Sequence, residues 1–189
     1  MADVFLGVGS NVDAERHLEF ALTALTPRFR VLAMSRAYRN PAVGHSGDDY
    51  LNLVVRIDTA LPPADLQDVL RNIEQTAARD RAASRCGPPT LDIDLLLYGT
   101  LVDPMLKLPR VDVLRHAFVL CPLAELAPDL RHPVSGQTMI GAWHQHRGAS
   151  SAWAGSGWFL NCSLAPSVRP VVAIAKEGPH AVVEDYCAR

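Results

Sequence analysis

Leu91-Asp92-Ile93-Asp94-Leu95-Leu96-Leu97-Tyr98 is an apolar stretch of eight residues that only two aspartates interrupt. A short apolar run of this kind predicts a buried β-strand. Residues two apart in a strand point to the same face, with backbones about 6.5–7 Å apart, so Asp92 and Asp94 project together. The strand therefore carries two neighbouring carboxylates in an otherwise apolar setting.

The segments around this strand alternate between strand and helix patterns. The expected strands are 4–8, 31–38, 51–58, 91–98 and one near 101–109. The expected helices are 13–25, capped by Asn11 or Asp13, then 61–78 and 117–126, with loops at 41–49 and 79–89. The order β-α-β-β-α-β predicts an α+β, ferredoxin-like fold, in which helices pack on the faces of an antiparallel sheet.

Length and composition predict one folded domain with an extension. The chain has 189 residues, 49% of them apolar and 20% charged, which is typical of globular proteins. We expect the domain to span 1–133. The extension, 134–189, is expected to pack on the same domain and to form a β-hairpin from 171–175 and 181–184.

Charge and hydropathy exclude two classes of partner. The formal net charge of −2 gives no overall field that would attract nucleic acid, so any anion site is local. No apolar run approaches the ~18 residues needed to cross a bilayer, and the N-terminus lacks a basic segment followed by an apolar one. We therefore expect a cytoplasmic protein with no nucleic-acid or membrane partner.

Asp92 and Asp94 are the sharpest chemical signal. Hard carboxylate oxygens that converge from one face of a strand favour Mg²⁺, although an exposed pair without a role is about equally compatible with these two residues alone. Arg79, Arg81 and Arg85 precede the strand and could close over a polyphosphate, or could each simply balance the end of a helix. Taken together, the arginines and aspartates favour nucleotide chemistry.

Other motifs narrow the kind of site. Gly7-Val8-Gly9-Ser10-Asn11 follows a strand but lacks the third glycine of a dinucleotide fingerprint, and the sequence contains no Walker A motif. Tyr50 and Asn52 lie at the start of the expected strand 51–58 and, being two residues apart, point to the same face. An aromatic ring beside an amide suits stacking on a flat heterocycle and pairing with its edge, although an ordinary strand start has the same pattern.

Several separated motifs together resemble one family. They are Gly9-Ser10-Asn11, Tyr38-Arg39-Asn40-Pro41, Tyr50-Leu51-Asn52, Ile73-Glu74 and 85–96, and the resemblance covers Val4 to Pro133. The chain is similar to the 6-hydroxymethyl-7,8-dihydropterin pyrophosphokinases of folate biosynthesis. The resemblance implies a ferredoxin-like fold and a Mg²⁺-dependent transferase that moves the diphosphate of ATP to the pterin hydroxymethyl group and releases AMP.

The resemblance also implies roles for single residues. Asp92 and Asp94 would hold two Mg²⁺ ions and, with Arg79 and Arg81, form the catalytic set. The pterin would be bound by Asn40, Pro41, Val43, Tyr50, Asn52 and Phe118, and ATP by Glu74, Arg85, Leu95, Arg110 and His116. The partners would be these two small molecules, with the protein a monomer or a homodimer.

The sequence departs from the family pattern at four places. Pro89 stands where the family has arginine, Cys86 where it has tryptophan, Arg110-Val111 where it has His-Tyr, and His116 where it has arginine. Arg110 or Arg115 could replace part of the lost positive charge. These departures imply weakened activity or, alternatively, a non-catalytic or altered relative that binds a pterin or a nucleotide. The two retained aspartates favour the enzyme.

Overall fold

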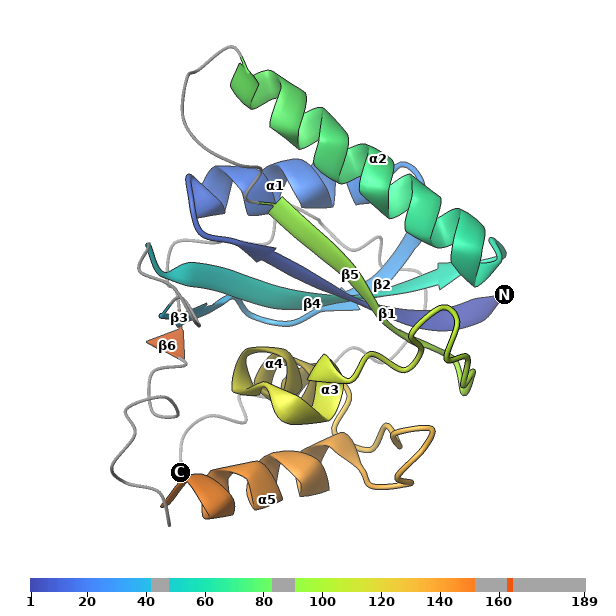
Figure 1. Ribbon diagram of the computed structural model, residues 1–189, viewed down its shortest axis with the longest axis vertical. Coiled ribbons are helices and arrows are strands. Elements are labelled where there is room, and N and C mark those ends of the chain that lie inside the picture. Colours follow the sequence, from blue (N-terminus) through green and yellow to red (C-terminus); the bar gives the residue numbers. More distant parts are fainter. Residues whose placement is uncertain (42–47, 83–90, 152–162, 165–189) are drawn as a thin grey trace, which may run out of the picture.

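The computed structural model describes residues 1–41, 48–82, 91–151 and 163–164 of the chain (Figure 1). Its sheet has the strand order β5-β1-β4-β3-β6, with β2 also paired to β4, and all of these pairs are antiparallel. The strands are β1 (Ala2–Ser10), β2 (Arg30–Met34), β3 (Tyr38–Asn40), β4 (Tyr50–Thr59), β5 (Leu91–Tyr98) and β6 (Ser163–Leu164). This topology confirms the expected ferredoxin-like α+β fold.

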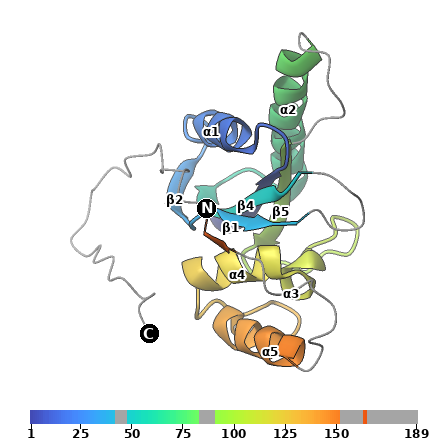
Figure 2. The same ribbon diagram turned by 90° about the vertical axis from the view of Figure 1, so that its left-hand side faces the viewer.

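Two helices, α1 (Ala14–Leu25) and α2 (Pro63–Ala82), cover one face of the sheet (Figure 2). Their apolar residues recur at helical spacing and are buried, namely Leu18, Ala21, Leu22 and Leu25 of α1 and Leu66, Leu70, Ile73 and Ala77 of α2. They pack against strand residues that include Leu91, Ile93 and Leu95 of β5. This layer is the larger of the two hydrophobic cores.

The opposite face is covered by α3 (Asp112–Arg115) and α4 (Ala117–Leu126), with α5 (Met139–Ser151) packed on α4 (Figures 1 and 2). Phe5, Val54 and Leu96 from the sheet meet Leu120 and Met139 from the helices in a second apolar core. Helix α4 was expected at these residues, whereas α3 and α5 were not. The weakly patterned, glycine-containing sequence of α5 gives little helical signal.

The expected strand 31–38 is in fact two strands, β2 and β3, that both pair with β4. Ser35 lies at the break, where its backbone N–H donates to the carbonyl of Val54 at 2.9 Å and its Oγ accepts from the amide of Val54 at 2.9 Å. The serine hydroxyl thus takes one place in the backbone ladder, and the strand is interrupted there.

Three other local expectations were wrong. Residues 101–109 form turns in place of a strand, because Asp103 Oδ1 accepts the amides of Met105 and Leu106 and closes the chain back on itself. Helix α2 continues through Ala82, into the expected loop. Asp13 stands at the start of α1 in a left-handed conformation (φ 45°) and makes no side-chain capping bond.

The expected C-terminal extension, 134–189, is described only in part. Helix α5 belongs to it and contributes Met139 and Ala142 to the second core, whereas the expected hairpin at 171–175 and 181–184 lies outside the described residues. Within the described ranges, no helix combines the length and the apolar character that crossing a membrane requires.

Candidate active site

A row of paired residues crosses the sheet on the α4 side. It brings expected pterin-binding residues and the expected metal ligands to one face of the sheet. Gly9 of β1 pairs with Asn52 of β4 on one side and with Asp92 of β5 on the other, and Asn52 in turn pairs with Tyr38 of β3. Paired residues share a face, so Asn52 and Asp92 project together, two strands or about 9–10 Å apart. Tyr50 and Asp94, each two residues along, lie on the same face.

Gly9 leaves room for the side chain of Asn52 in this row. A Cβ at this position would lie 2.6 Å from Oδ1 of Asn52, closer than such atoms approach. The absence of a side chain leaves Asn52 free to turn toward β3, where its Nδ2 donates to Oδ1 of Asn40 at 2.5 Å. Asn40 also donates to the carbonyl of Pro41 at 3.0 Å. The hydrogen bonds therefore fix the orientation of the Asn52 amide.

An acidic pocket of about 350 Å³ lies beside this row, between α2, β5 and the turns that follow β5. Its lining includes Glu74, Asp92, Asp94, Leu95 and Arg110. Glu74 reaches over from α2, and its Oε1 accepts the backbone N–H of Ile93 at 2.7 Å.

Burial and mutual repulsion disfavour the charged forms of the carboxylates in the acidic pocket. Burial, and then the charge of Asp92, raises the pKa of Glu74 to about 7, although the bond from the Ile93 amide lowers it. Burial, and then Asp92, raises the pKa of Asp94 to about 6, against the lowering effect of Arg110. A cation bound here would relieve this repulsion.

Arg110 connects the acidic pocket to α4. Its Nη2 lies 2.8 Å from Oδ2 of Asp94 and 2.8 Å from Oδ2 of Asp112. Oδ1 of Asp112 lies 3.5 Å from Nε2 of His116, whose ring stacks on Phe118 with centroids 5.0 Å apart. A continuous set of contacts therefore runs from the aspartates to the aromatic ring at the start of α4.

The residues present fit Mg²⁺ in the form that accompanies phosphates. Among the described residues, no three His, Cys, Asp or Glu side chains gather into a complete metal cage. Mg²⁺ is, however, usually held by one or two carboxylates plus water and substrate phosphates. Asp92 and Asp94 project from one face of β5 into the acidic pocket, where the charge of Asp92 helps to raise the pKa of Asp94, and this donor set suits that mode of binding.

The other expected site residues lie in several places. Arg79 and Arg81 belong to the last turns of α2, while Val43, Arg85, Cys86 and Pro89 fall outside the described residues. Helix α4, which carries Phe118, packs on β4, which carries Tyr50 and Asn52. The roles assigned to all of these residues stay predictions.

Sequence reasoning missed two cations of the acidic pocket, Arg71 and Lys107. Arg71 precedes Glu74 by three residues on α2, so helical spacing alone places the two side chains on neighbouring positions of one face. Lys107 has a positive φ of 56° in the turn after β5, and nothing in the sequence indicated that this turn folds back over the pocket.

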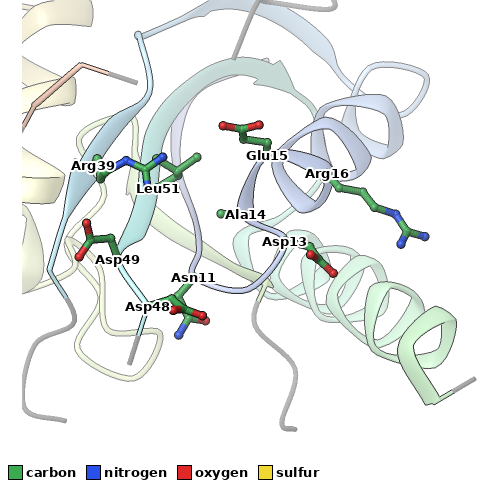
Figure 3. A pocket seen from close by; sticks show the side chains of 9 residues that line it. All are labelled: Asn11, Asp13, Ala14, Glu15, Arg16, Arg39, Asp48, Asp49 and Leu51. Atoms are coloured by element: carbon green, nitrogen blue, oxygen red, sulfur yellow. The ribbon is translucent and has the colours of Figure 1, made fainter. Parts of the chain in front are cut away.

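A second, larger pocket of about 780 Å³ lies where β1 leads into α1 (Figure 3). Arg39 and Leu51 line it, and in Figure 3 the side chain of Arg39 lies near Leu51 and Asp49. Because Leu51 precedes Asn52 in a strand, its side chain points to the opposite face of the sheet. This pocket is therefore separate from the row that holds Asn52 and Asp92.

Comparison with known proteins identifies the family. The sequence model of 7,8-dihydro-6-hydroxymethylpterin-pyrophosphokinase matches residues 5–128. A protein of Methylorubrum extorquens named 2-amino-4-hydroxy-6-hydroxymethyldihydropteridine pyrophosphokinase is 43% identical over 145 residues, which cover 74% of this chain and 90% of that protein. One of the same name from Pseudomonas aeruginosa is 43% identical over 136 residues, covering 69% and 83%.

Solved structures agree at the level of the fold. The crystal structure of wild-type HPPK-DHPS from Plasmodium falciparum with SDX-DHP superimposes with a TM-score of 0.71 at 12% identity. The match covers 87% of this chain and 48% of that one, so this chain spans about half of that protein's length. The expected family resemblance is confirmed, and the chain belongs to the 7,8-dihydro-6-hydroxymethylpterin-pyrophosphokinase family.

Proposed function

We propose that this protein transfers the diphosphate of ATP to the hydroxymethyl group of 6-hydroxymethyl-7,8-dihydropterin. In this reaction the hydroxymethyl oxygen forms a bond to the β-phosphorus, the bond from that phosphorus to the α-phosphate oxygen breaks, and AMP leaves. The hydroxyl proton is released. The observation that carries the proposal is the row on the sheet, which puts the amide of Asn52 and the carboxylate of Asp92 on one face with Gly9 between them.

The pterin is assigned to the β3 and β4 side of this row. The Asn52 amide, held by Asn40, has a donor and an acceptor for the edge of the heterocycle. Tyr50 and Phe118 would supply aromatic rings for stacking, and Asn40, Pro41 and Val43 complete the proposed set of pterin-binding residues.

ATP is assigned to the acidic pocket and its surroundings. Asp92 and Asp94 would hold the Mg²⁺, which supplies charge stabilisation to the phosphates when bound. Glu74, Leu95, Arg110 and His116 would bind the nucleotide, and Arg79, Arg81 and Arg85 would bind its phosphates. Phosphoryl transfer needs little covalent chemistry from the protein, so alignment and charge are what these side chains contribute.

AMP formation from ATP, Mg²⁺ and the dihydropterin tests the proposal. We expect pterin-dependent AMP from the wild type, at least a hundredfold less from Asp94→Asn, and an unchanged rate from Asp129→Asn. Asp129 is an exposed aspartate between α4 and α5 and serves as the matched control. Absence of AMP from a wild-type protein that still quenches pterin fluorescence would overturn the enzyme and leave a pterin-binding relative.

A further inference from the structure

Arg110 is bound on both sides by acids of the site but is not fully satisfied. Its Nη2 lies 2.8 Å from Asp94 and from Asp112, and about a third of its side chain is exposed. Its Nε is buried without a hydrogen-bond partner among the described residues. A guanidinium has five N–H groups, so this side chain keeps donors available for a further acceptor.

The contact with Asp94 conflicts with a cation at the same carboxylate. A guanidinium and a divalent ion on one carboxyl group repel each other in a half-buried pocket, where the effective dielectric constant is low. Arg71, another cation of the acidic pocket, is paired with Asp68 of its own helix, whereas Arg110 is paired with Asp94 itself. Arg110 is thus placed to neutralise the carboxylate when no metal does.

We propose that Arg110 is an internal counter-cation that a metal–nucleotide complex displaces from Asp94. Without ligand, Arg110 holds Asp94. When the complex binds, the guanidinium leaves Asp94, stays anchored on Asp112 and donates to a phosphate oxygen. This inference rests on the proposed function, because it takes Asp94 as a metal ligand. It adds that a metal ion alone only competes with Arg110 for Asp94, whereas a metal ion with its nucleotide also gives Arg110 a new partner.

The proposal has a thermodynamic consequence. A metal ion that binds alone must compete with Arg110 for Asp94, and it provides no new acceptor for the displaced guanidinium. A nucleotide supplies a new acceptor for the displaced guanidinium, so nucleotide and metal strengthen each other's binding by the same factor. Removal of the Arg110 charge should therefore shift the two affinities in opposite directions.

Titration calorimetry with Mn²⁺ as the probe tests this directly. For Arg110→Gln we expect the affinity for Mn²⁺ alone to rise at least about fivefold. The affinity for Mn²⁺ with an ATP analogue that carries a methylene bridge between the α- and β-phosphorus atoms should fall at least about tenfold. Arg110→Lys, which keeps the charge, should stay near the wild type for Mn²⁺ alone.

Controls separate this inference from folding and from the proposed function. Arg28→Gln removes an exposed arginine at the end of α1 and should change neither affinity. If Arg110→Gln does not fold, Arg110→Met is measured in its place, since it retains much of the side-chain shape.

The outcomes are distinct. An unchanged or weakened affinity of Arg110→Gln for Mn²⁺ alone would overturn the counter-cation even if the wild type makes AMP. If the wild type binds no Mn²⁺ even with the analogue, both this inference and the proposed function fail.

Discussion

Neighbouring residues of β5 face two very different surroundings. The side chains of Ile93 and Leu95 are 4% and 3% exposed beneath α1 and α2, at the border of the acidic pocket, whereas those of Asp92 and Asp94 point to the opposite face of the sheet. One side of the strand therefore contributes the hydrophobic burial that stabilises the fold. The other side concentrates charge at some cost to stability.

The division ends abruptly at Leu96. The register of β1 against β5 shifts between Phe5 and Leu6, which pair with Leu97 and Leu95 and leave Leu96 as an extra residue. This bulge lets Leu95 join the first core while Leu96 and Leu97 join the second. The comparison shows that stability and proposed chemistry are separated by single residues along one strand, so single substitutions should separate them too.

The largest expected effect comes from the acidic side. Asp92→Asn should lower the rate of AMP formation by about 100–1,000-fold, because it removes a charge that the proposed metal requires. The midpoint of thermal unfolding should stay the same or rise, since the pocket loses one of several repelling charges. Parallel measurement of rate and unfolding checks this, and a large loss of both would contradict the division.

The converse variant is Ile93→Ala, one residue away on the apolar side. It should lower the free energy of unfolding by about 2–5 kcal/mol, through lost burial and the cavity left under α1 and α2. The rate per folded molecule, measured well below the unfolding midpoint, should remain close to that of the wild type. Urea titration and an AMP assay on the same sample decide the point.

Gly9→Ala tests the row between the two halves of the site. The new Cβ would meet Oδ1 of Asn52 at 2.6 Å, so the amide must turn and give up its bond to Asn40. We expect the KM for the pterin to rise roughly tenfold, the value of about one hydrogen bond, with a smaller change in the KM for ATP. Equal changes in both constants would place the disturbance elsewhere.

Tyr38→Phe removes a bond that fastens β3 to α4. The Tyr38 hydroxyl donates to Oε2 of Glu125 at 2.8 Å, and the other oxygen of Glu125 accepts from Arg36. Loss of one bond to a carboxylate should cost about 1–2 kcal/mol of unfolding free energy. Arg36→Gln, which breaks the more exposed contact of the same carboxylate, should cost less in the same urea titration.

A further expected effect is a pH dependence of the free energy of unfolding. The raised pKa of Glu74, about 7 against an ordinary 4.5, means that the folded protein binds this proton more tightly than the unfolded chain. The contribution of Glu74 to stability is thus present below about pH 4.5 and declines as the pH rises to about 7. Glu74→Gln should flatten this decline, and an unchanged slope would contradict the assignment.

Much of the fold could be predicted because the patterns are local. The apolar run 91–98 became β5 at the expected residues, and the helical spacing of α1 gave its buried face. The break at Ser35 could not be foreseen, because it depends on a side-chain bond to Val54 in another strand. Residues 101–109 look like a strand in composition but fold as turns around Asp103.

In the candidate site, too, only the features that depend on local patterns and strand order could be predicted. The common face of Asp92 and Asp94 follows from the two-residue period of a strand, and their proximity to Asn52 follows from the order and register of the strands. The pairing of Arg110 with Asp94 depends on how the turns after β5 return the chain, which no local pattern states. It therefore came only from the structure.

The Glu74 carboxylate also has a consequence for assembly. In the described sheet β5 is the end strand, and such strands can recruit a strand from another molecule. Here the outward amide of Ile93 is taken by Glu74, and the carbonyl of Leu96 accepts the backbone N–H of Arg110 at 3.0 Å. Two of the positions that a foreign strand would use are already filled, so the same residues that frame the acidic pocket guard this edge against aggregation.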